Sequence, residues 1–212
     1  MRFPGEILVQ HKWIVFLATF VVIVGIFAGA NESAYENFMK SAPKVTWENI
    51  PESAMILFVW NLRNALMSLL GIILAFFSGF GLGMSIGIGL WLISQNTLYI
   101  ANFSHGILEL YSVFLAMIGG LLILVKIGEA ILGFFEFTPH YVDWKEVEKD
   151  YGSLFLFSII GLFVSAWMEA LLGYVVVRFR PSAWLLVIVN TLISLLIISN
   201  LSSNTIRAIM TG

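Results

Sequence analysis

The sequence predicts an all-α integral membrane protein, and three observations lead to this class. Of the 212 residues, 59% are hydrophobic and only 11% are charged, whereas a soluble domain has roughly 25% charged residues. The mean hydropathy is +0.94. The apolar residues gather into runs of about 20, the length at which a helix crosses a bilayer. We therefore expect a single polytopic membrane domain over residues 1–212.

Six apolar segments are long enough to span the bilayer. The first follows a basic stretch and ends in Ala28-Gly29-Ala30, which is also typical of a signal peptide, but its length favours an uncleaved span. The expected spans are Trp13–Ala30, Ile56–Phe77, Phe80–Ala101, Ser104–Lys126, Ser153–Val176 and Ala183–Asn200.

The second and third segments form one long apolar stretch. Between Ala54 and Ala101 the only charge is Arg63, and as one helix this stretch would be roughly 70 Å long. It must therefore fold back, and Ser78-Gly79-Phe80-Gly81 is the predicted turn. If one segment is re-entrant, five spans remain, and this alternative stays open.

Two further stretches predict short helices that lie at the membrane interface. Asn31–Ser53 contains Ser33-x-x-Glu36, a capping box, and Pro43 ends its helical pattern. Phe134–Gly152 opens a second helix at Thr138-Pro139 and places its aromatic residues on one side. Aromatic side chains anchor helices at this depth, which favours an interfacial position for both.

The distribution of basic residues predicts the orientation. With six spans and a cytoplasmic N-terminus, the inner basic residues are Arg2, Lys12, Lys126, Lys145, Lys149 and Arg207, and the outer ones are Lys40, Lys44, Arg178 and Arg180. The positive-inside rule agrees with this arrangement. We therefore expect a multi-pass protein of the cell membrane with its N-terminus in the cytoplasm.

Small residues recur at every second position of the third segment. Because each helical residue turns about 100°, they form two nearly opposite tracks. The tracks are Gly79/Gly83/Gly87 and Gly81/Ser85/Gly89. Each track lets another helix come close, so this segment is expected at the bundle centre or at a subunit interface.

Polar side chains within the apolar segments are the main functional signal, because each of them is costly in a membrane. Counted from the segment ends, Arg63, Glu109, Glu169 and Asn190 all fall roughly 8–11 Å below the outer surface. The sequence thus predicts a polar layer built from four helices. The candidate ligand- or ion-binding residues are Asn61, Arg63, Asn64, His105, Glu109, Glu169 and Asn190.

This layer has a structural interpretation and several functional ones. In the structural one, Arg63 neutralises Glu109 or Glu169 as a buried ion pair. In the functional ones, a remaining carboxylate and His105 relay a proton or cation, or His105, Glu109 and Glu169 bind a divalent metal. An enzyme is least favoured, because the sequence lacks His-Glu-x-x-His and Gly-x-Ser-x-Gly. No residue is assigned a catalytic role, and no cofactor is expected apart from this candidate metal.

The second to fourth segments resemble the stage II sporulation protein M family. The matching features are Asn61 and Asn64 at the start of a helix, the glycines from Gly79 to Gly89, and His105-Gly106 with Glu109. The chain departs from the family at Ser104, where proline is frequent, and at Tyr111, where proline or a small residue is common. The namesake resembles a membrane partner in a peptidoglycan-remodelling complex, and for other members the resemblance implies transport or the assembly of membrane complexes.

From these observations we expect a non-enzymatic scaffold or subunit of a membrane complex. Its expected partners are the lipid bilayer, further copies of the chain and other subunits; a net charge of −2 gives no reason to expect nucleic acid. The alternative is a transporter or channel for a small ion or solute. A cavity that reaches Glu109 or Glu169 would favour transport, whereas a sealed layer with Arg63 bonded to a carboxylate would favour the scaffold.

Overall fold

The computed structural model describes residues 2–70, 74–95, 103–135, 142–178 and 183–211, without the side chains of 69–70, 103–105, 183–186 and 202–211. All regular structure in these ranges is helical, as the sequence predicts. The helices are α1 (Pro4–Gln10), α2 (Lys12–Gly29), α3 (Glu32–Ser41), α4 (Ile50–Leu70), α5 (Leu74–Gln95), α6 (Phe103–Phe135), α7 (Trp144–Arg178) and α8 (Ala183–Thr211).

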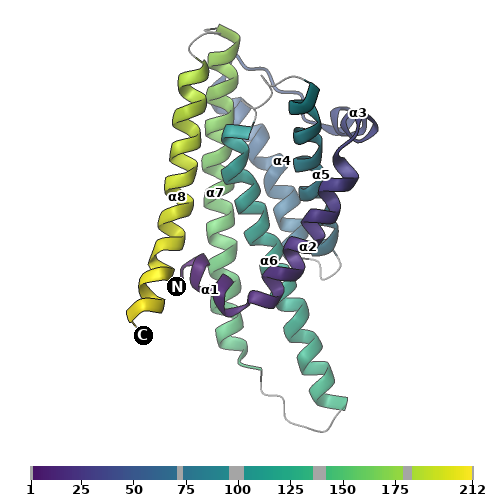
Figure 1. The fold of residues 1–212 in the computed structure, drawn as a ribbon, viewed down its shortest axis with the longest axis vertical. Coiled ribbons are helices and arrows are strands. Elements are labelled where there is room, and N and C mark those ends of the chain that lie inside the picture. Colours follow the sequence, from purple (N-terminus) through teal and green to yellow (C-terminus); the bar gives the residue numbers. More distant parts are fainter. Residues whose placement is uncertain (1, 71–73, 96–102, 136–141, 179–182, 212) are drawn as a thin grey trace.

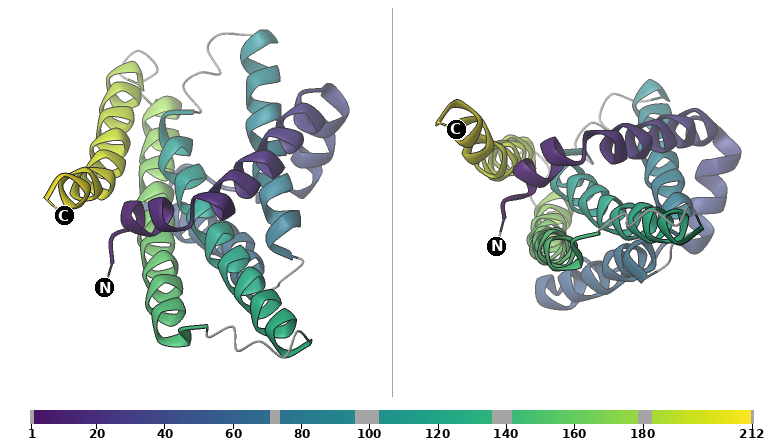
Figure 2. Two further views of the ribbon diagram at one scale, coloured as in Figure 1. Left: turned by 60° about the horizontal axis from the view of Figure 1, so that its bottom comes forward. Right: turned by 90° about the horizontal axis from the view of Figure 1, so that it is seen from below.

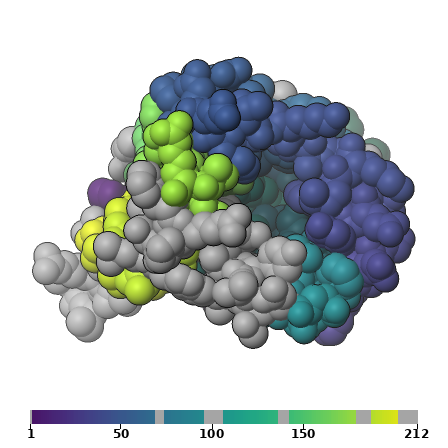
Figure 3. Space-filling view, turned by 90° about the horizontal axis from the view of Figure 1, so that it is seen from above, coloured from purple at the N-terminus to yellow at the C-terminus, as the bar shows by residue number. Residues whose placement is uncertain are grey.

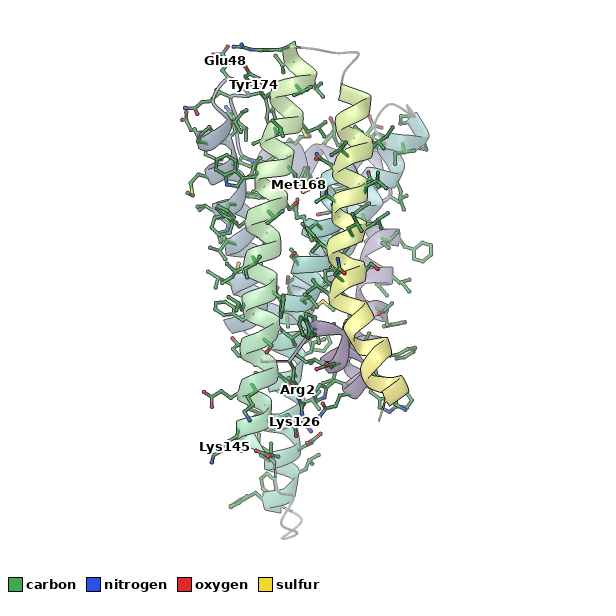
Figure 4. All side chains as sticks on the ribbon, turned by 90° about the vertical axis from the view of Figure 1, so that its left-hand side faces the viewer. Arg2, Glu48, Lys126, Lys145, Met168 and Tyr174 are labelled. Carbon is green, nitrogen blue, oxygen red and sulfur yellow. The ribbon has the colours of Figure 1, made fainter. Side chains whose placement is uncertain are left out.

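The long helices form one bundle in which successive helices run in alternating directions (Figure 1). Helix α2 packs along α5, and α6 packs along α7. Helix α4 contacts α5, α6 and α7, while α8 lies against α6 and α7. Glu48 and Tyr174 mark one end of the bundle, here called the α3 end, and Arg2, Lys126 and Lys145 mark the other, the α1 end (Figure 4).

Helix α6 is the central element of the bundle. It contacts α2, α4, α5, α7 and α8 (Figure 2), and every residue from 115 to 122 is buried. Helix α5 lies to one side, against α2. The glycine-rich segment was expected at the bundle centre or at a subunit interface; within one chain α6 occupies the centre, and a position at a subunit interface stays a prediction.

Four of the described helices are long and apolar enough to cross a membrane: α2, α5, α6 from Gly106 onward, and α7. Helix α8 contributes a shorter apolar stretch, Val187–Leu201. Helix α4 is less apolar, because Pro51, Glu52, Asn61 and Arg63 lie within it. The composition and these helices support a membrane protein, although they do not fix the number of spans at six.

Helices α6 and α7 exceed the thickness of a bilayer. They contain 33 and 35 residues, which correspond to about 50 Å each, whereas the hydrocarbon core is about 30 Å thick. Their far ends form the protrusion at the bottom of Figure 1. This part of α6 carries an ion pair of 2.7 Å between Lys126 and Glu129, followed by exposed apolar side chains that include Phe134 and Phe135.

The turn predicted at Ser78–Gly81 is wrong. Helix α4 ends at Leu70 and α5 begins at Leu74, so these four residues lie within α5. The reason is packing: a Cβ atom at Gly79 would collide with the Met117 side chain of α6. The glycine at this position serves a close helix contact and not a change in chain direction.

The two predicted interfacial helices have different outcomes. The first is present as α3, but its N-cap is Asn31, whose side-chain Oδ1 accepts a 3.0 Å hydrogen bond from the Ala34 amide, and not Ser33. The second is not a separate helix, since residues 144–152 are the first turns of α7. Thr138 and Pro139 lie outside the described residues.

The short helix α1 was not expected from the sequence. It starts with Pro4 at its first position, where proline is favoured. Ile7 is fully buried and joins a core cluster with Leu115 and Leu121 of α6 and with Leu154 of α7. Seven residues are too few for a hydropathy signal, which explains why the pattern missed this helix.

Candidate functional site

A contact between α4 and α6 forms the centre of the polar layer. Asn61 is only 6% exposed, and its side chain lies beside the Glu109 carboxylate, close enough to interact with it. A carboxylate that is partly withdrawn from water is stabilised by a neighbouring amide of this kind. The sequence predicted both residues as members of one site, and the structure brings them into contact.

The second carboxylate of the layer comes from α7. Glu169 lies close enough to Glu109 for their charges to interact. One turn further along α6, Ser112 is buried, donates to the Leu108 carbonyl over 2.7 Å, and lies against Gly161 of α7. The face of α6 that carries Glu109 and Ser112 therefore points into the bundle, as their spacing predicted.

Helix α8 adds an amide to the same region. Asn190 is 2% exposed, and its Nδ2 donates a 3.4 Å hydrogen bond to the carbonyl of Met168, the residue before Glu169. Figure 4 shows Met168 on α7, in the part of the bundle nearer the α3 end. Asn61, Glu109, Glu169 and Asn190 come from four helices, and three of them, Glu109, Glu169 and Asn190, are among the four residues counted to one depth along the sequence.

Arg63 is not part of this layer. Its guanidinium lies 4.9 Å from the centre of the Trp60 ring on the same helix, and the residue is exposed. Within the described part of the chain it forms no ion pair with Glu109 or Glu169. The structure therefore gives no support to Arg63 as the counter-charge of either glutamate.

The metal hypothesis is not tested by this structure. His105 belongs to α6, one turn before Glu109, but its side chain lies outside the described residues. Among the residues that are described, no three His, Asp or Glu side chains come together as a metal site would require. His105, Glu109 and Glu169 therefore remain a sequence-based prediction.

A cavity of about 330 Å³ reaches the polar layer between α4, α5 and α6. Figure 3, which views the molecule from the α3 end, shows a hollow beside α3 and α4. Three of the predicted site residues, Asn61, Asn64 and Glu109, line the cavity. Its other lining residues are Phe38, Trp60, Met67, Leu74, Phe77, Ser78, Gly81, Leu82, Ser85, Leu110 and Val113.

The two glycine tracks of α5 have different surroundings. A Cβ atom at Gly83 or Gly87 would collide with the α2 backbone, at Val22 and Ile26 respectively. A Cβ at Gly81, by contrast, would have no heavy atom within 4 Å. The Gly79/Gly83/Gly87 track thus permits close helix packing, as predicted, whereas Gly81 and Ser85 of the second track line the cavity.

The α2 side of this helix crossing was missed by the sequence analysis. Gly25 and Gly29 of α2 meet the α5 backbone at Phe80 and Met84. Their spacing is Gly-x-x-x-Gly, a recognised close-packing pattern in membrane helices. This signal was present in the sequence and could have identified α2 as the partner of α5.

A second polar cluster at the α1 end was also missed. The fully buried Asp150 of α7 lies 3.1 Å from His11 Nε2 and 3.3 Å from Arg2 Nη1. Burial acts to lower the pKa of Arg2, but the hydrogen bonds and charges of Glu146 and Asp150 outweigh it and raise the pKa. Arg2 is therefore cationic, and the cluster attaches α1 to α7.

Together, the apolar helices, the buried carboxylates between them and the cavity beside them define a polytopic α-helical membrane protein with an internal polar site. Comparison with protein families agrees: the model for stage II sporulation protein M matches residues 13–173. The chain belongs to the stage II sporulation protein M family. No curated protein and no solved structure matches the chain.

The matched region separates the chain into a shared part and two ends. It includes every residue that carried the resemblance, from Asn61 to Glu109, as well as Glu169. Helices α1 and α8 lie outside it, and these two helices contact each other. Asn190 is therefore a contribution to the polar layer from outside the matched region.

Proposed function

We propose that this chain is a non-enzymatic, transporter-type protein of the cell membrane that binds a small solute in the cavity beside Glu109. The observation that carries the proposal is the cavity itself, because it reaches a half-buried carboxylate between the helices. Concave, mostly apolar sites with a few polar groups are the usual form of a small-molecule site. Intramembrane acids commonly mark the path of a substrate or ion.

The proposal includes six spans and a cytoplasmic N-terminus. Alternating helix directions support six spans, with α4 and α8 as the two less apolar ones (Figure 1). Arg2, Lys126 and Lys145 at the α1 end support a cytoplasmic position for that end (Figure 4). Glu109 then lies in the outer half of the membrane, since α6 begins only six residues before it.

The sequence analysis favoured a scaffold over a transporter, and this proposal reverses that order. The scaffold interpretation required a sealed layer with Arg63 bonded to a carboxylate. Instead, Arg63 contacts Trp60, and a cavity adjoins Glu109. Both observations support a site that accepts a ligand. The non-enzymatic role is supported by the lining, in which Glu109 is the single ionisable side chain among the described residues.

A scaffold role is the second candidate, supported by one observation. The small-residue track at Gly81 and Ser85 has no helix of this chain packed closely on it among the described residues, and such a track is a common contact for a helix of another subunit. In this case a second copy of the chain, and not a solute, would cover the cavity and produce a homo-oligomer.

Cysteine substitution separates the two candidates, because the chain has no native cysteine. We would introduce Gly81→Cys and Asn64→Cys in the cavity, and Gly83→Cys in the α2–α5 contact as the matched buried control. Membranes that contain each variant are treated with N-ethylmaleimide, and a parallel sample is oxidised to reveal disulfide-linked dimers. The solute site predicts rapid labelling at positions 81 and 64, with position 83 protected.

The alternative outcomes are equally clear. Disulfide-linked dimers of Gly81→Cys, together with slow labelling, would support the scaffold and overturn the solute site. Protection at all three positions would mean that the cavity is closed to small molecules, which also contradicts the proposal. Helical content and elution as a single species are measured first, so that a misfolded variant is not scored.

A further inference from the structure

We propose that the cavity beside Glu109 binds a single-chain amphiphile with an ammonium head group, which enters it from the bilayer. This inference rests on the proposed function and specifies the class of ligand. It is drawn from the distribution of polar and apolar side chains along the cavity, its length, its lateral opening and its charge.

The polar groups of the cavity gather at one end. Asn61 and Glu109 lie side by side there, and Asn64 lies one helical turn from Asn61 on the same lining. Phe38 is the free aromatic residue of this end, because the Trp60 ring already contacts the Arg63 guanidinium. A quaternary ammonium group has no N–H to donate, but it finds a carboxylate and an aromatic ring at this end, and both favour a cation.

The opposite end of the cavity is apolar. Its lining there consists of Met67 of α4 with Leu74 and Phe77 of α5. On α5 the lining extends from Leu74 to Ser85, a distance of about 16 Å along the helix axis. A lining that is polar at one end and apolar at the other over this length matches a head group joined to a hydrocarbon chain.

The absence of a side chain at Gly81 makes room for this chain. Gly81 lies between the two ends of the α5 lining, and a Cβ there would have no heavy atom within 4 Å. Any larger residue would project into the groove. The second small-residue track of α5 therefore has a specific use, namely to keep the groove open between its polar and apolar ends.

At its apolar end the cavity reaches the outer surface of the bundle, because two of its lining residues are exposed there. Phe77 is 67% exposed and Met67 is 45% exposed, and both line its apolar end. In a membrane these exposed side chains contact the acyl chains of lipids. An amphiphile can thus enter sideways, with its hydrocarbon chain remaining in an apolar environment throughout.

The volume and the charge of the cavity restrict which amphiphiles it can bind. A volume of about 330 Å³ is near the lower limit of roughly 300–1,000 Å³ for small-molecule sites, so one chain fits better than two. Among the described residues, Glu109 forms no ion pair with a basic side chain. A cationic head group complements this carboxylate, whereas an anionic one would be repelled.

The test measures ligand binding to the full chain in nanodiscs of neutral lipid. The probe is radiolabelled dodecyltrimethylammonium, and the competitors are dodecanoate, which reverses the charge, and tetramethylammonium, which lacks the chain. We expect saturable binding that dodecanoate and tetramethylammonium displace at least tenfold less well than unlabelled probe. Glu109→Gln and Gly81→Leu should each weaken binding at least tenfold, by removing the charge and by filling the groove.

Matched controls lie outside the cavity. Glu148→Gln removes an exposed carboxylate of α7, and Gly128→Leu adds a side chain where the structure has open space; both should bind the probe normally. If Glu109→Gln fails to fold, Gly81→Leu still tests whether the probe binds in the cavity. Normal binding by a folded Gly81→Leu, or equal competition by dodecanoate, would overturn the inference.

The inference and the proposed function can fail separately. If tetramethylammonium competes as well as the long-chain probe, the solute site stands and the amphiphile is excluded. If no probe binds while Gly81→Cys and Asn64→Cys are labelled rapidly, the cavity is accessible and only the ligand class is wrong. Protection of both cysteines from N-ethylmaleimide would contradict the proposed function itself.

Discussion

Asn61 of α4 and Glu109 of α6 meet inside the helix bundle, with the amide beside the carboxylate. This contact is the point at which the polar layer meets the cavity, because both residues line it. Glu169 then extends the layer from Glu109 to α7. The stability of the bundle and the recognition of a ligand therefore depend on the same carboxylate.

The Asn61→Leu substitution tests how much this contact contributes to stability. It leaves the Glu109 carboxylate without its neighbouring amide, and we expect a cost of about 1–3 kcal/mol in the free energy of unfolding, as for a buried polar group that loses its partner. For a chain of this size, each kcal/mol lowers the Tm by about 2–4 °C. Thermal unfolding in detergent measures the shift. Asn64→Leu is the control, since Asn64 also lines the cavity but makes no described bond to Glu109; equal losses would argue against a special role for Asn61.

The Arg63→Gln substitution tests whether Arg63 acts as a buried counter-charge. The guanidinium is exposed and contacts the Trp60 ring, an arrangement that contributes roughly 0.5–1 kcal/mol. We therefore expect the free energy of unfolding to change by no more than about 1 kcal/mol. A loss of about 3–5 kcal/mol, which is typical when one partner of a buried ion pair is removed, would show that Arg63 neutralises a glutamate after all.

A pair of alanine substitutions tests the two faces of α5. Gly83→Ala places a methyl group against the Val22 carbonyl of α2, and overpacking of this kind costs about 1–3 kcal/mol. Gly81→Ala points into open space and should raise stability by about 0.5–1 kcal/mol, because alanine favours a helix more than glycine does. Chemical denaturation compares the two variants, and the prediction fails if both have the same sign.

The Asp150→Asn substitution tests the attachment of α1. Asp150 is fully buried and faces His11 and Arg2, so loss of its charge should release α1 from α7. We expect amide hydrogen exchange in residues 4–10 to accelerate by roughly tenfold, since hydrogen bonds to charged groups are stronger than neutral ones. Exchange in α5 should not change. Glu148→Gln, an exposed acid two residues away, is the control, and similar effects of both variants would contradict the assignment.

The sequence predicted the helices and the polar layer because both depend on local composition. Apolar runs of the right length define the spans, and counting residues from their ends placed Glu109 and Glu169 at one depth. In the structure these two residues are neighbours. The same counting could not place Arg63, because depth says nothing about which way a side chain points around the helix axis.

Other features depended on contacts that no local pattern reveals. The glycine at position 79 is compatible with a turn or with close helix packing, and only the presence of α6 and α2 beside it decides between these. The contact between His11 and Asp150 joins residues far apart in the chain. The cavity is likewise a property of three helices together, so the sequence could state only that its presence would favour transport.

The unbroken course of α6 has a mechanical consequence. From Glu109 to Phe135 the helix rises by about 39 Å, and Phe134 and Phe135 at its far end are highly exposed. A helix of this length transmits displacement along its axis. A displacement of the tip along the axis would therefore be carried to Glu109, because α6 has no break between them.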